Sequence, residues 1–542
     1  MLGLLAALQR PSRDVGAAAS APYLTVFLLD GLSESVFRAE LEGGRLPHIA
    51  ALASRGAFVD HGISSFPSMT ASGFHPFLTG QDAARSGVLG LRWFDRRRTS
   101  GNLRSYVGFT QDQINSDLAL RPASIYERVG GQHTFSVNTF ANRGVRESAR
   151  LGWSFGLAKY RDVWGPVRAL AAVPLLGGTM APEWETAETR AVRHAIDDLV
   201  RWPKVQWITF SSLDGYQHVH GTDARYAALL RHADGLIGLY RQASTRLGQE
   251  PYRVYAVVSD HGVADARVNV DLRSVLRECC GLSAVRDRAT RFRTSSLDVP
   301  LSEYDEADAI VVVNGNMMNY LYVRDPSAAP GQQWRRPLGE ARLSRYGQRG
   351  VDLVEGLLSA SGVELVIVRG DLPGLVVVRG GAGRGLISRH GAALAYRAEG
   401  ADPLGYAARG LADDVARTPA QWLSATHDAG HPDAVHRIAV LMENRDAGDL
   451  VVTSAAGYDL GAGYELLVGS YRGGHGGLRA DQIRVPYVVA GPGVARGARI
   501  PAARAEDVGV TLLALMGLAP EGEADGELLR GLLEPPAVGQ AR

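Results

Sequence analysis

Four short apolar runs, each followed by polar residues, constrain the fold of this chain more than any other sequence feature. The runs are Tyr23–Leu29, Val205–Phe210, Val254–Val258 and Tyr487–Ala490. Uninterrupted apolar runs of this length are typical of strands that are buried on both faces, as in a parallel sheet. Stretches with apolar residues at helical spacing lie between them, at Leu46–Ala57, Glu185–Trp202 and Ala224–Leu247. This alternation predicts an α/β, doubly wound core with a mostly parallel sheet.

The segment from about residue 285 to 440 has a different texture. Short strand-like pieces separated by Gly, Pro and Asp occur at Ala309–Val313, Leu321–Val323, Glu364–Val368, Leu375–Val378 and Gly385–Ser388. We interpret this segment as a hairpin-rich α+β subdomain, inserted like a cap into the core. The predicted organisation is an N-terminal segment at 1–21, the first part of the core at 22–284, the inserted subdomain at 285–440 and the second part of the core at 441–542. A chain of 542 residues is too long for one core of ordinary size.

Composition excludes several classes of protein. The 58 Lys and Arg residues nearly balance the 57 Asp and Glu residues, which is not typical of a nucleic-acid-coating surface. Only Lys159 and Lys204 are lysine, a bias that we interpret as codon usage. The two cysteines, Cys279 and Cys280, are adjacent, so any metal is expected on His and carboxylate side chains. No run approaches about 18 apolar residues, so no membrane-spanning helix is expected. Because Met1–Leu8 is short and lacks a basic leader, we expect a cytoplasmic protein, with export as the alternative.

Ligand-type residues follow three of the apolar runs. Asp30 follows the first, Asp214 the second, and Asp260 and His261 the third. Because ligands of open α/β sheets bind at the carboxyl ends of the strands, we expect these side chains to converge. His218 lies four residues after Asp214 and shares its face if the segment is helical. Each residue alone also has an ordinary interpretation, as a turn, a cap or a solvated helix face.

Two further segments carry candidate residues. Ser65-Phe66-Pro67-Ser68-Met69-Thr70 is a polar, turn-prone entry to a helix, which would place backbone N–H groups and the helix dipole at the Thr70 hydroxyl. An ordinary helix cap at Thr70 is the alternative. His475 stands in Gly473-Gly474-His475-Gly476-Gly477, where glycines permit close backbone approach, and a flexible loop is the alternative.

Taken together, these segments resemble the alkaline phosphatase superfamily, and most closely its type I phosphodiesterase/nucleotide pyrophosphatase branch. The resemblance covers about residues 22–275 and 450–530. It implies two divalent ions, zinc or alternatively manganese. The implied ligands are Asp30, Thr70, Asp260 and His261 for one ion, and Asp214, His218 and His475 for the other. It also implies that Thr70, activated by metal, attacks phosphorus in line and forms a phosphothreonine that water then hydrolyses.

The sequence departs from this branch at two positions. Gly73 and Leu91 stand where its members often carry asparagines that contact a phosphate oxygen. Backbone N–H groups after Thr70 are possible substitutes, and so are Asn316 and Asn319. For these two asparagines we favour a turn between strands. The departures weaken the case for nucleotide diesters as substrates.

The resemblance therefore predicts a phosphohydrolase that cleaves phosphodiester or phosphomonoester bonds of a small substrate. The alternatives are a phosphomutase or phosphotransferase on the same core, and a non-catalytic metal-binding interaction module. The sequence contains no pattern that sets an oligomeric state. His75 lies about one turn after Thr70 and either supports the site or is an ordinary helix residue. For the other histidines we favour structural or exposed roles. The alternatives are a competing ligand at His220, a substrate contact at His390 and a third metal at His427, His431 and His436.

Overall fold

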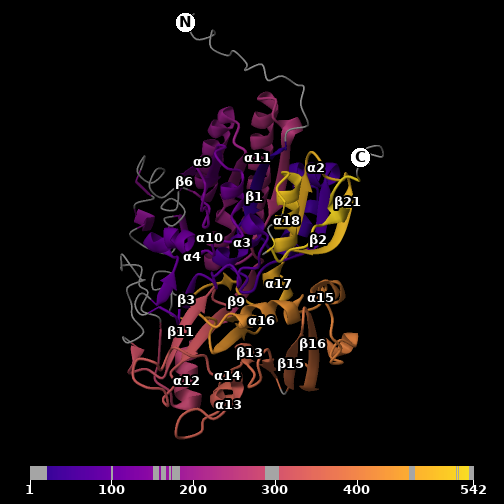
Figure 1. Cartoon of the computed structure of the whole chain (residues 1–542). Helices are drawn as coiled ribbons and strands as arrows, with labels where there is room; N and C mark the ends of the chain where they lie inside the picture. Colours follow the sequence, from indigo (N-terminus) through magenta and orange to yellow (C-terminus); the bar gives the residue numbers. More distant parts are fainter. Residues whose placement is uncertain are drawn as a thin grey trace, which may run out of the picture.

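A computed structural model gives the fold (Figure 1). It describes residues 21–98, 102–150, 158–159, 161, 167–169, 172–173, 183–286, 304–381, 383–462, 470–519, 522 and 524–535. The predicted N-terminal segment therefore lies outside the described residues, except for its last residue. Among the residues that are described, no helix is both long and apolar enough to cross a membrane.

An eight-stranded sheet forms the centre of the core. Its spatial order is β21 (Ala498–Arg504), β2 (Ala57–Ile63), β20 (Arg484–Ala490), β8 (Arg253–Val258), β1 (Tyr23–Leu29), β7 (Val205–Phe210), β5 (Thr134–Val137) and β6 (Glu147–Ala149). Neighbouring strands are parallel except where β20 pairs, antiparallel to both β2 and β8. The four apolar runs are thus strands, but the fourth runs against the others. An apolar run that is buried on both faces looks the same in either direction, so the pattern alone could not set this orientation.

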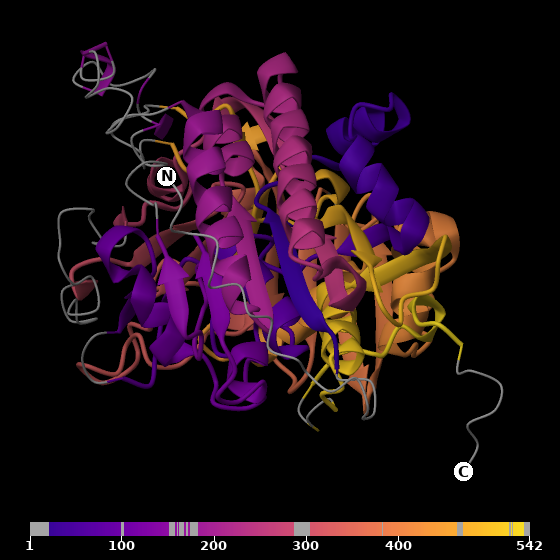
Figure 2. The same cartoon turned by 90° about the horizontal axis from the view of Figure 1, so that it is seen from above.

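Helices cover both faces of this sheet. Alternate residues of β1 point into two different apolar clusters: Val26 and Leu28 join one, and Phe27 and Leu29 join the other. The helices on the second side are α1 (Glu34–Glu42), α2 (Pro47–Arg55), α9 (Trp184–Asp198) and α11 (Ala224–Arg246). Helices α3 (Thr70–Thr79) and α18 (Ala505–Leu515) pack on the first side. Figure 2 shows α9 and α11 side by side over one face of the sheet. The doubly wound prediction is confirmed.

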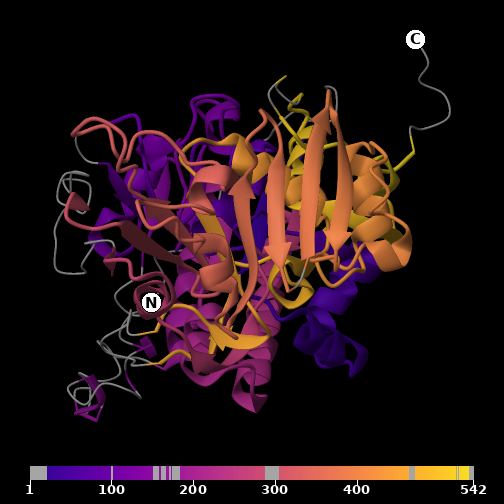
Figure 3. The same ribbon diagram turned by 90° about the horizontal axis from the view of Figure 1, so that it is seen from below.

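A second sheet of eight strands lies beside the core, with its orange strands in front in Figure 3. Its spatial order is β10 (Ala284–Arg286), β11 (Ala309–Asn314), β12 (Met318–Val323), β17 (Leu450–Ser454), β13 (Val363–Arg369), β14 (Val376–Gly380), β15 (Gly383–His390) and β16 (Ala393–Gly400). All neighbours are antiparallel except β10 and β11. Strand β17 belongs to this sheet, although the alternating α/β pattern of the core was expected from about residue 450. The predicted division of the chain at residues 21, 284 and 440 remains a prediction.

Smaller elements complete the described chain. The short strands are β3 (Arg92–Phe94), β4 (Leu103–Ser105), β9 (Ala264–Asn269), β18 (Gly457–Asp459) and β19 (Gly473–Gly474). The remaining α-helices are α4 (Ile114–Asp117), α5 (Ile125–Arg128), α10 (Ser212–His220), α12 (Leu272–Cys280), α13 (Glu340–Leu343), α14 (Leu353–Leu358), α15 (Pro419–Thr426), α16 (Ala434–Glu443) and α17 (Ala480–Ile483). Cys279 and Cys280 end α12, where the Cys280 side chain packs into the core of the second sheet.

A buried ionic network joins α16 to the core. The Arg437 guanidinium lies 2.6 Å from the Asp82 carboxylate and 2.8 Å from that of Glu506. Asp82 follows α3, Glu506 begins α18, and the three side chains are buried. In this environment each carboxylate depends on the arginine, because a buried charge without its partner is costly. The network therefore holds α3 and α18 against the helices beside the second sheet.

We predict that Arg437→Met lowers the free energy of unfolding by about 3–5 kcal/mol, because it leaves two buried carboxylates without their cation. Arg397→Met is the control, since Arg397 pairs with Glu399 at an exposed position. Its effect is expected to stay below about 1 kcal/mol. Urea denaturation measures both variants, and equal losses of stability would contradict the role of the network.

Candidate metal centre

Three neighbouring parallel strands bring the predicted ligand residues to one edge of the core sheet. Strand β1 lies between β7 and β8 and is parallel to both. Asp30 directly follows β1, Asp260 and His261 follow β8, and Asp214 lies in the first turn of α10, which follows β7. Because the carboxyl ends of parallel strands share an edge, these side chains meet there.

Asp30, Asp260 and His261 form one group of possible metal ligands. Their ligand atoms all lie within 4.8 Å of one another. His261 Nε2 is 3.4 Å from Asp30 Oδ1 and 3.5 Å from Asp260 Oδ2. The Thr70 hydroxyl lies 3.3 Å from the same nitrogen. All four residues are buried, so this group is largely shielded from bulk water.

Asp214, His218 and His475 meet beside His261. Asp214 Oδ1 is 3.2 Å from His218 Nε2 and 3.5 Å from His475 Nε2. The ligand atoms of Asp214, His261 and His475 also lie within 4.8 Å of one another. The rings of His261 and His475 stack with their centroids 3.7 Å apart, so the two groups form one contiguous cluster. The structure thus brings all seven predicted site residues together.

Each of the three histidines directs Nε2 toward a carboxylate because its Nδ1 is engaged by the backbone. The acceptors are the carbonyl oxygens of Gly473 for His218 (3.0 Å), Gly262 for His261 (2.9 Å) and Ser68 for His475 (3.0 Å). A carbonyl oxygen can only accept, so Nδ1 carries the proton and Nε2 keeps its lone pair. Backbone contacts of this kind orient imidazole ligands in metal sites.

Burial and mutual repulsion dominate the electrostatics of the cluster. Burial, followed by the neighbouring Asp260 carboxylate, holds the pKa of Asp30 well above its usual value. Burial likewise raises the pKa of Asp260 and holds that of His475 well below its usual value. For Asp214, burial raises the pKa, but the surrounding imidazoles, His218 foremost, outweigh it and hold the pKa well below the usual range. The cluster therefore brings several carboxylates together in a buried environment, where their charged forms are unfavourable.

The donor atoms suit a divalent cation. Asp30 Oδ1 and Asp260 Oδ2 are buried and have no hydrogen-bond partner among the described residues. A cation would stabilise such oxygens, since buried charges otherwise need a partner. Carboxylate oxygens together with imidazole Nε2 atoms are a donor set for zinc or manganese.

Thr70 is the first residue of α3, a helix whose ten residues are all buried. The N-cap position is occupied by Met69, whose side chain makes no capping hydrogen bond. Thr70 is therefore not the helix cap, and its hydroxyl lies beside His261. The first N–H groups of a helix have no acceptor within it, and the positive end of the helix dipole lies there. The helix start thus favours an anion next to the Thr70 hydroxyl.

The glycine at position 73 has a steric cause. A Cβ atom on Gly73 would lie 2.4 Å from the Asp260 carbonyl oxygen and 2.6 Å from the Asp260 Cβ. Rotation of a side chain cannot relieve contacts with backbone atoms. No larger residue, asparagine included, fits while α3 keeps this distance from the residue that follows β8.

Leu91, Asn316 and Asn319, the other positions considered for contacts to phosphate, make contacts within the protein. The N–H of Leu91 lies 3.2 Å from the sulfur of Met69. Asn316 hydrogen-bonds the carboxylate of Asp459, and Asn319 donates to a backbone carbonyl at 3.2 Å. Asn316 lies in the turn between β11 and β12, as the favoured interpretation predicted, whereas Asn319 lies within β12.

The turn between β11 and β12 also supports the cluster, which sequence reasoning missed. The His475 N–H donates to Gly315 O at 2.9 Å, and the Met317 N–H donates to His475 O at 3.0 Å. Gly315 has φ +61°, and a Cβ there would lie 2.8 Å from His475 Nδ1. The second sheet therefore helps to place a predicted ligand. The Asn-Gly-Asn turn was visible in the sequence, but its distant partner was not.

Two buried polar side chains near α10, Gln217 and Glu188, were also not identified from the sequence as supports of the cluster. Gln217 Nε2 donates to Asp214 Oδ1 at 3.0 Å. Glu188 on α9 accepts the Ser212 N–H at 2.8 Å, at the start of α10. Burial raises the pKa of Glu188 to about 7. The sequence signal for Gln217 was its place between Asp214 and His218, whereas Glu188 had none.

The remaining candidate residues lie outside the cluster. Among the residues that the structure describes, the groups close enough to share a metal are Asp30, Asp260 and His261, and Asp214, His261 and His475. His220 stacks on Tyr216, and His427 stacks on His61. His75 is buried and contacts the Ser86 hydroxyl.

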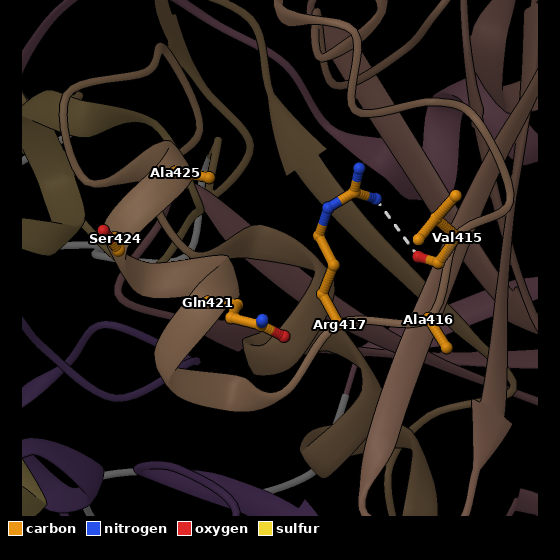
Figure 4. A pocket seen from close by; sticks show the side chains of 6 residues that line it. All are labelled: Val415, Ala416, Arg417, Gln421, Ser424 and Ala425. Atoms are coloured by element: carbon orange, nitrogen blue, oxygen red, sulfur yellow. Dashed lines mark hydrogen bonds between the residues drawn. The ribbon is translucent and has the colours of Figure 1, made fainter.

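A shallow pocket elsewhere on the surface has no such chemistry (Figure 4). Its lining residues are Val415, Ala416, Arg417, Gln421, Ser424 and Ala425. Arg417, its charged residue, already pairs with Asp413 at 2.7 Å and donates to Val415 O at 3.1 Å. The pocket is therefore a poor rival to the cluster as the functional site.

Comparison with known proteins agrees with this geometry. A family model described as type I phosphodiesterase / nucleotide pyrophosphatase matches residues 24–333. Murine ectonucleotide pyrophosphatase/phosphodiesterase 5, solved as an inactive variant in complex with AMP, has a similar structure, with a TM-score of 0.54 and 11% identity over 95% of this chain and 100% of that chain. The human protein of the same name gives 0.52 and 12% over 95% and 100%. At such identities these two structures show the fold alone. No curated protein sequence matches significantly.

We predict that Gly73→Ala destabilises the protein by about 1–3 kcal/mol, because the added methyl group forces α3 away from Asp260. Gly235→Ala is the matched control: Gly235 lies inside α11 with open space at its Cβ. There alanine is expected to stabilise by about 0.5–1 kcal/mol, through helix propensity. Urea denaturation measures both. A Gly73→Ala protein as stable as wild type would show that the contact is not tight.

Proposed function

Because the chain belongs to the type I phosphodiesterase/nucleotide pyrophosphatase family, we propose that it is a two-metal hydrolase of phosphodiester, or phosphomonoester, bonds that uses Thr70 as its nucleophile. The observation that carries the proposal is the Thr70 hydroxyl at the start of α3, 3.3 Å from His261 Nε2 and beside the carboxylate and imidazole cluster. A hydroxyl in such a position can attack phosphorus with the cluster on one side and helix N–H groups on the other.

The metals would be held by this chain's own oxygen and nitrogen atoms. One ion would bind Asp30, Thr70, Asp260 and His261, and the other Asp214, His218 and His475. The buried oxygens without partners and the Nε2 lone pairs support this assignment. When bound, zinc or manganese ions lower the pKa of the Thr70 hydroxyl and neutralise phosphate charge.

The reaction we propose has two displacements. The Thr70 oxygen gives up its proton to solvent and forms a bond to phosphorus as the bond to the leaving alcohol breaks, which gives a phosphothreonine and an alcohol that takes up a proton. A water molecule then loses a proton and attacks this phosphorus from the side that the alcohol has left, and the Thr70 oxygen leaves and is protonated again. The backbone N–H groups of the first turn of α3 stabilise charge on the phosphate oxygens, in place of the asparagines that Gly73 and Leu91 replace.

We expect Thr70→Ala to lose at least about 1,000-fold in kcat, because no other group takes over the attack. Thr70→Ser keeps a hydroxyl and should retain measurable turnover. Hydrolysis of 4-nitrophenyl phosphate and of bis(4-nitrophenyl) phosphate measures both variants, and the ratio of the two rates separates monoester from diester preference. Thr79→Ala, at the other end of α3, controls for damage to the helix. Full activity in Thr70→Ala would overturn the mechanism.

Removal of metal should abolish turnover and also lower the melting temperature, because it leaves the buried carboxylates close together without compensation. Dialysis against a chelator, followed by addition of zinc or manganese, tests this, with metal content measured at each stage. The Arg397→Met protein, altered far from the cluster, should respond as wild type does. Unchanged activity and unfolding after complete removal would argue against a metal centre.

A further inference from the structure

The ring of Tyr471 forms an aromatic wall of the cluster, on the side of His218. The Tyr471 ring packs against the His218 ring with the centroids 4.7 Å apart and an angle of 30°. The next residue, Arg472, donates its N–H to His218 O at 2.8 Å. Tyr471 is only 7% exposed, so its position is set by packing against α10 and not by solvent.

Lys159 lies on this wall. Its Nζ donates to the phenol oxygen of Tyr471 at 3.0 Å and lies 4.7 Å from the centre of the ring. The preceding residue, Ala158, is buried in the same apolar cluster as Trp184 and Tyr216. A buried neighbour in the chain fixes the base of the lysine side chain, while Lys159 itself is half-buried. The ammonium is therefore held at Tyr471, whose ring separates it from His218 of the cluster.

The second lysine of the chain has a different role. Lys204 precedes β7, at the end of the strand opposite to α10, and its Nζ donates to Ala21 O at 2.5 Å. It also covers the Tyr23 ring at 5.1 Å. The two lysines thus lie at opposite edges of the core sheet. All other basic residues are arginine, so amine chemistry can distinguish the two sites.

A series of contacts leads from the nucleophile to Lys159. Thr70 contacts His261, whose ring stacks on His475. The centroids of the His475 and His218 rings lie 5.3 Å apart. The His218 ring contacts the Tyr471 ring, and the Tyr471 hydroxyl accepts a hydrogen bond from Lys159. An in-line displacement places the leaving oxygen opposite the attacking one. Because Thr70 contacts His261 at one end of this series, we place the leaving alcohol at the other end, on the side of His218.

We propose that Lys159, held by Tyr471, binds an anionic group on the leaving alcohol. The substrates would then be phosphate esters whose alcohol portion carries a carboxylate or a further phosphate. Lysine is a compact point charge on a flexible stem and suits a mobile terminal anion. This inference rests on the proposed function, because it needs Thr70 to define the side on which the alcohol leaves.

Two phenyl phosphate diesters test the proposal. Their leaving phenols differ only in a para substituent, which is a carboxylate in one and its neutral methyl ester in the other. We expect Lys159→Gln to raise KM for the carboxylate diester about 10-fold and to leave KM for the methyl ester unchanged, as the loss of a charge-assisted hydrogen bond predicts. Lys159→Arg should restore most of the difference, and Lys204→Arg should behave as wild type. Equal KM values for the two diesters in wild type would overturn the proposal.

A binding measurement separates this outcome from failure of the hydrolase itself. Reductive methylation with carbon-13 labels Lys159, Lys204 and the terminal amine, and Lys159→Arg assigns the first signal. Addition of 4-hydroxybenzoate, the anionic product, should shift the Lys159 signal alone, and its methyl ester should shift neither lysine. If neither diester is hydrolysed, the proposed function fails and this titration decides the anion site. A Lys159 signal unmoved by 4-hydroxybenzoate would overturn it.

Discussion

The parallel alignment of β7, β1 and β8 is the constraint on which the candidate site depends. In-register pairing of three adjacent strands ends them at one edge of the sheet, and each carries acidic residues just beyond its end. The resulting crowding of Asp30, Asp214 and Asp260 is unfavourable in a buried setting, as the raised pKa values of Asp30 and Asp260 indicate. Backbone pairing across the sheet holds the carboxylates together against this repulsion, which leaves a cation as the natural partner.

The second sheet and the glycine-rich loop around His475 add contacts that position the cluster of possible ligands. His475 is distant in sequence from the other cluster residues and is held on two sides, by the Ser68 carbonyl and by the turn at Gly315. Backbone carbonyls engage Nδ1 of every histidine in the cluster, so the orientation of the rings follows from main-chain geometry. Such contacts are rigid, because moving a ring would require moving a strand or a turn. The turn between β11 and β12 therefore helps to hold a predicted ligand in place.

Close backbone approach explains the glycine at position 73. Gly73 is required because α3 lies against Asp260, and that closeness places Thr70 beside His261. The buried pairs of Arg437 keep the far end of α3 in place through α18. Helix α3 is thus fixed at both ends, by steric fit at its start and by ion pairs beyond its end. The N–H groups of its first turn remain available to an anion.

The sequence by itself determined the doubly wound core, the strand ends that carry Asp30, Asp214 and Asp260, and the helical pairing of Asp214 with His218, since these depend on local periodicity and short spacing. It also singled out Thr70 and His475, through motif order. Tertiary structure alone decided that β20 runs antiparallel, that β17 joins the second sheet, and that Gly315, Gln217 and Glu188 support the cluster. The sequence pattern of an apolar strand does not depend on the direction of the strand or on the sheet to which it belongs. Contacts between residues that are distant in sequence produce no periodic pattern. Only the packed chain brings Lys159 to Tyr471, because Ala158, next to Lys159, is buried in the core cluster while Tyr471 packs on the His218 ring.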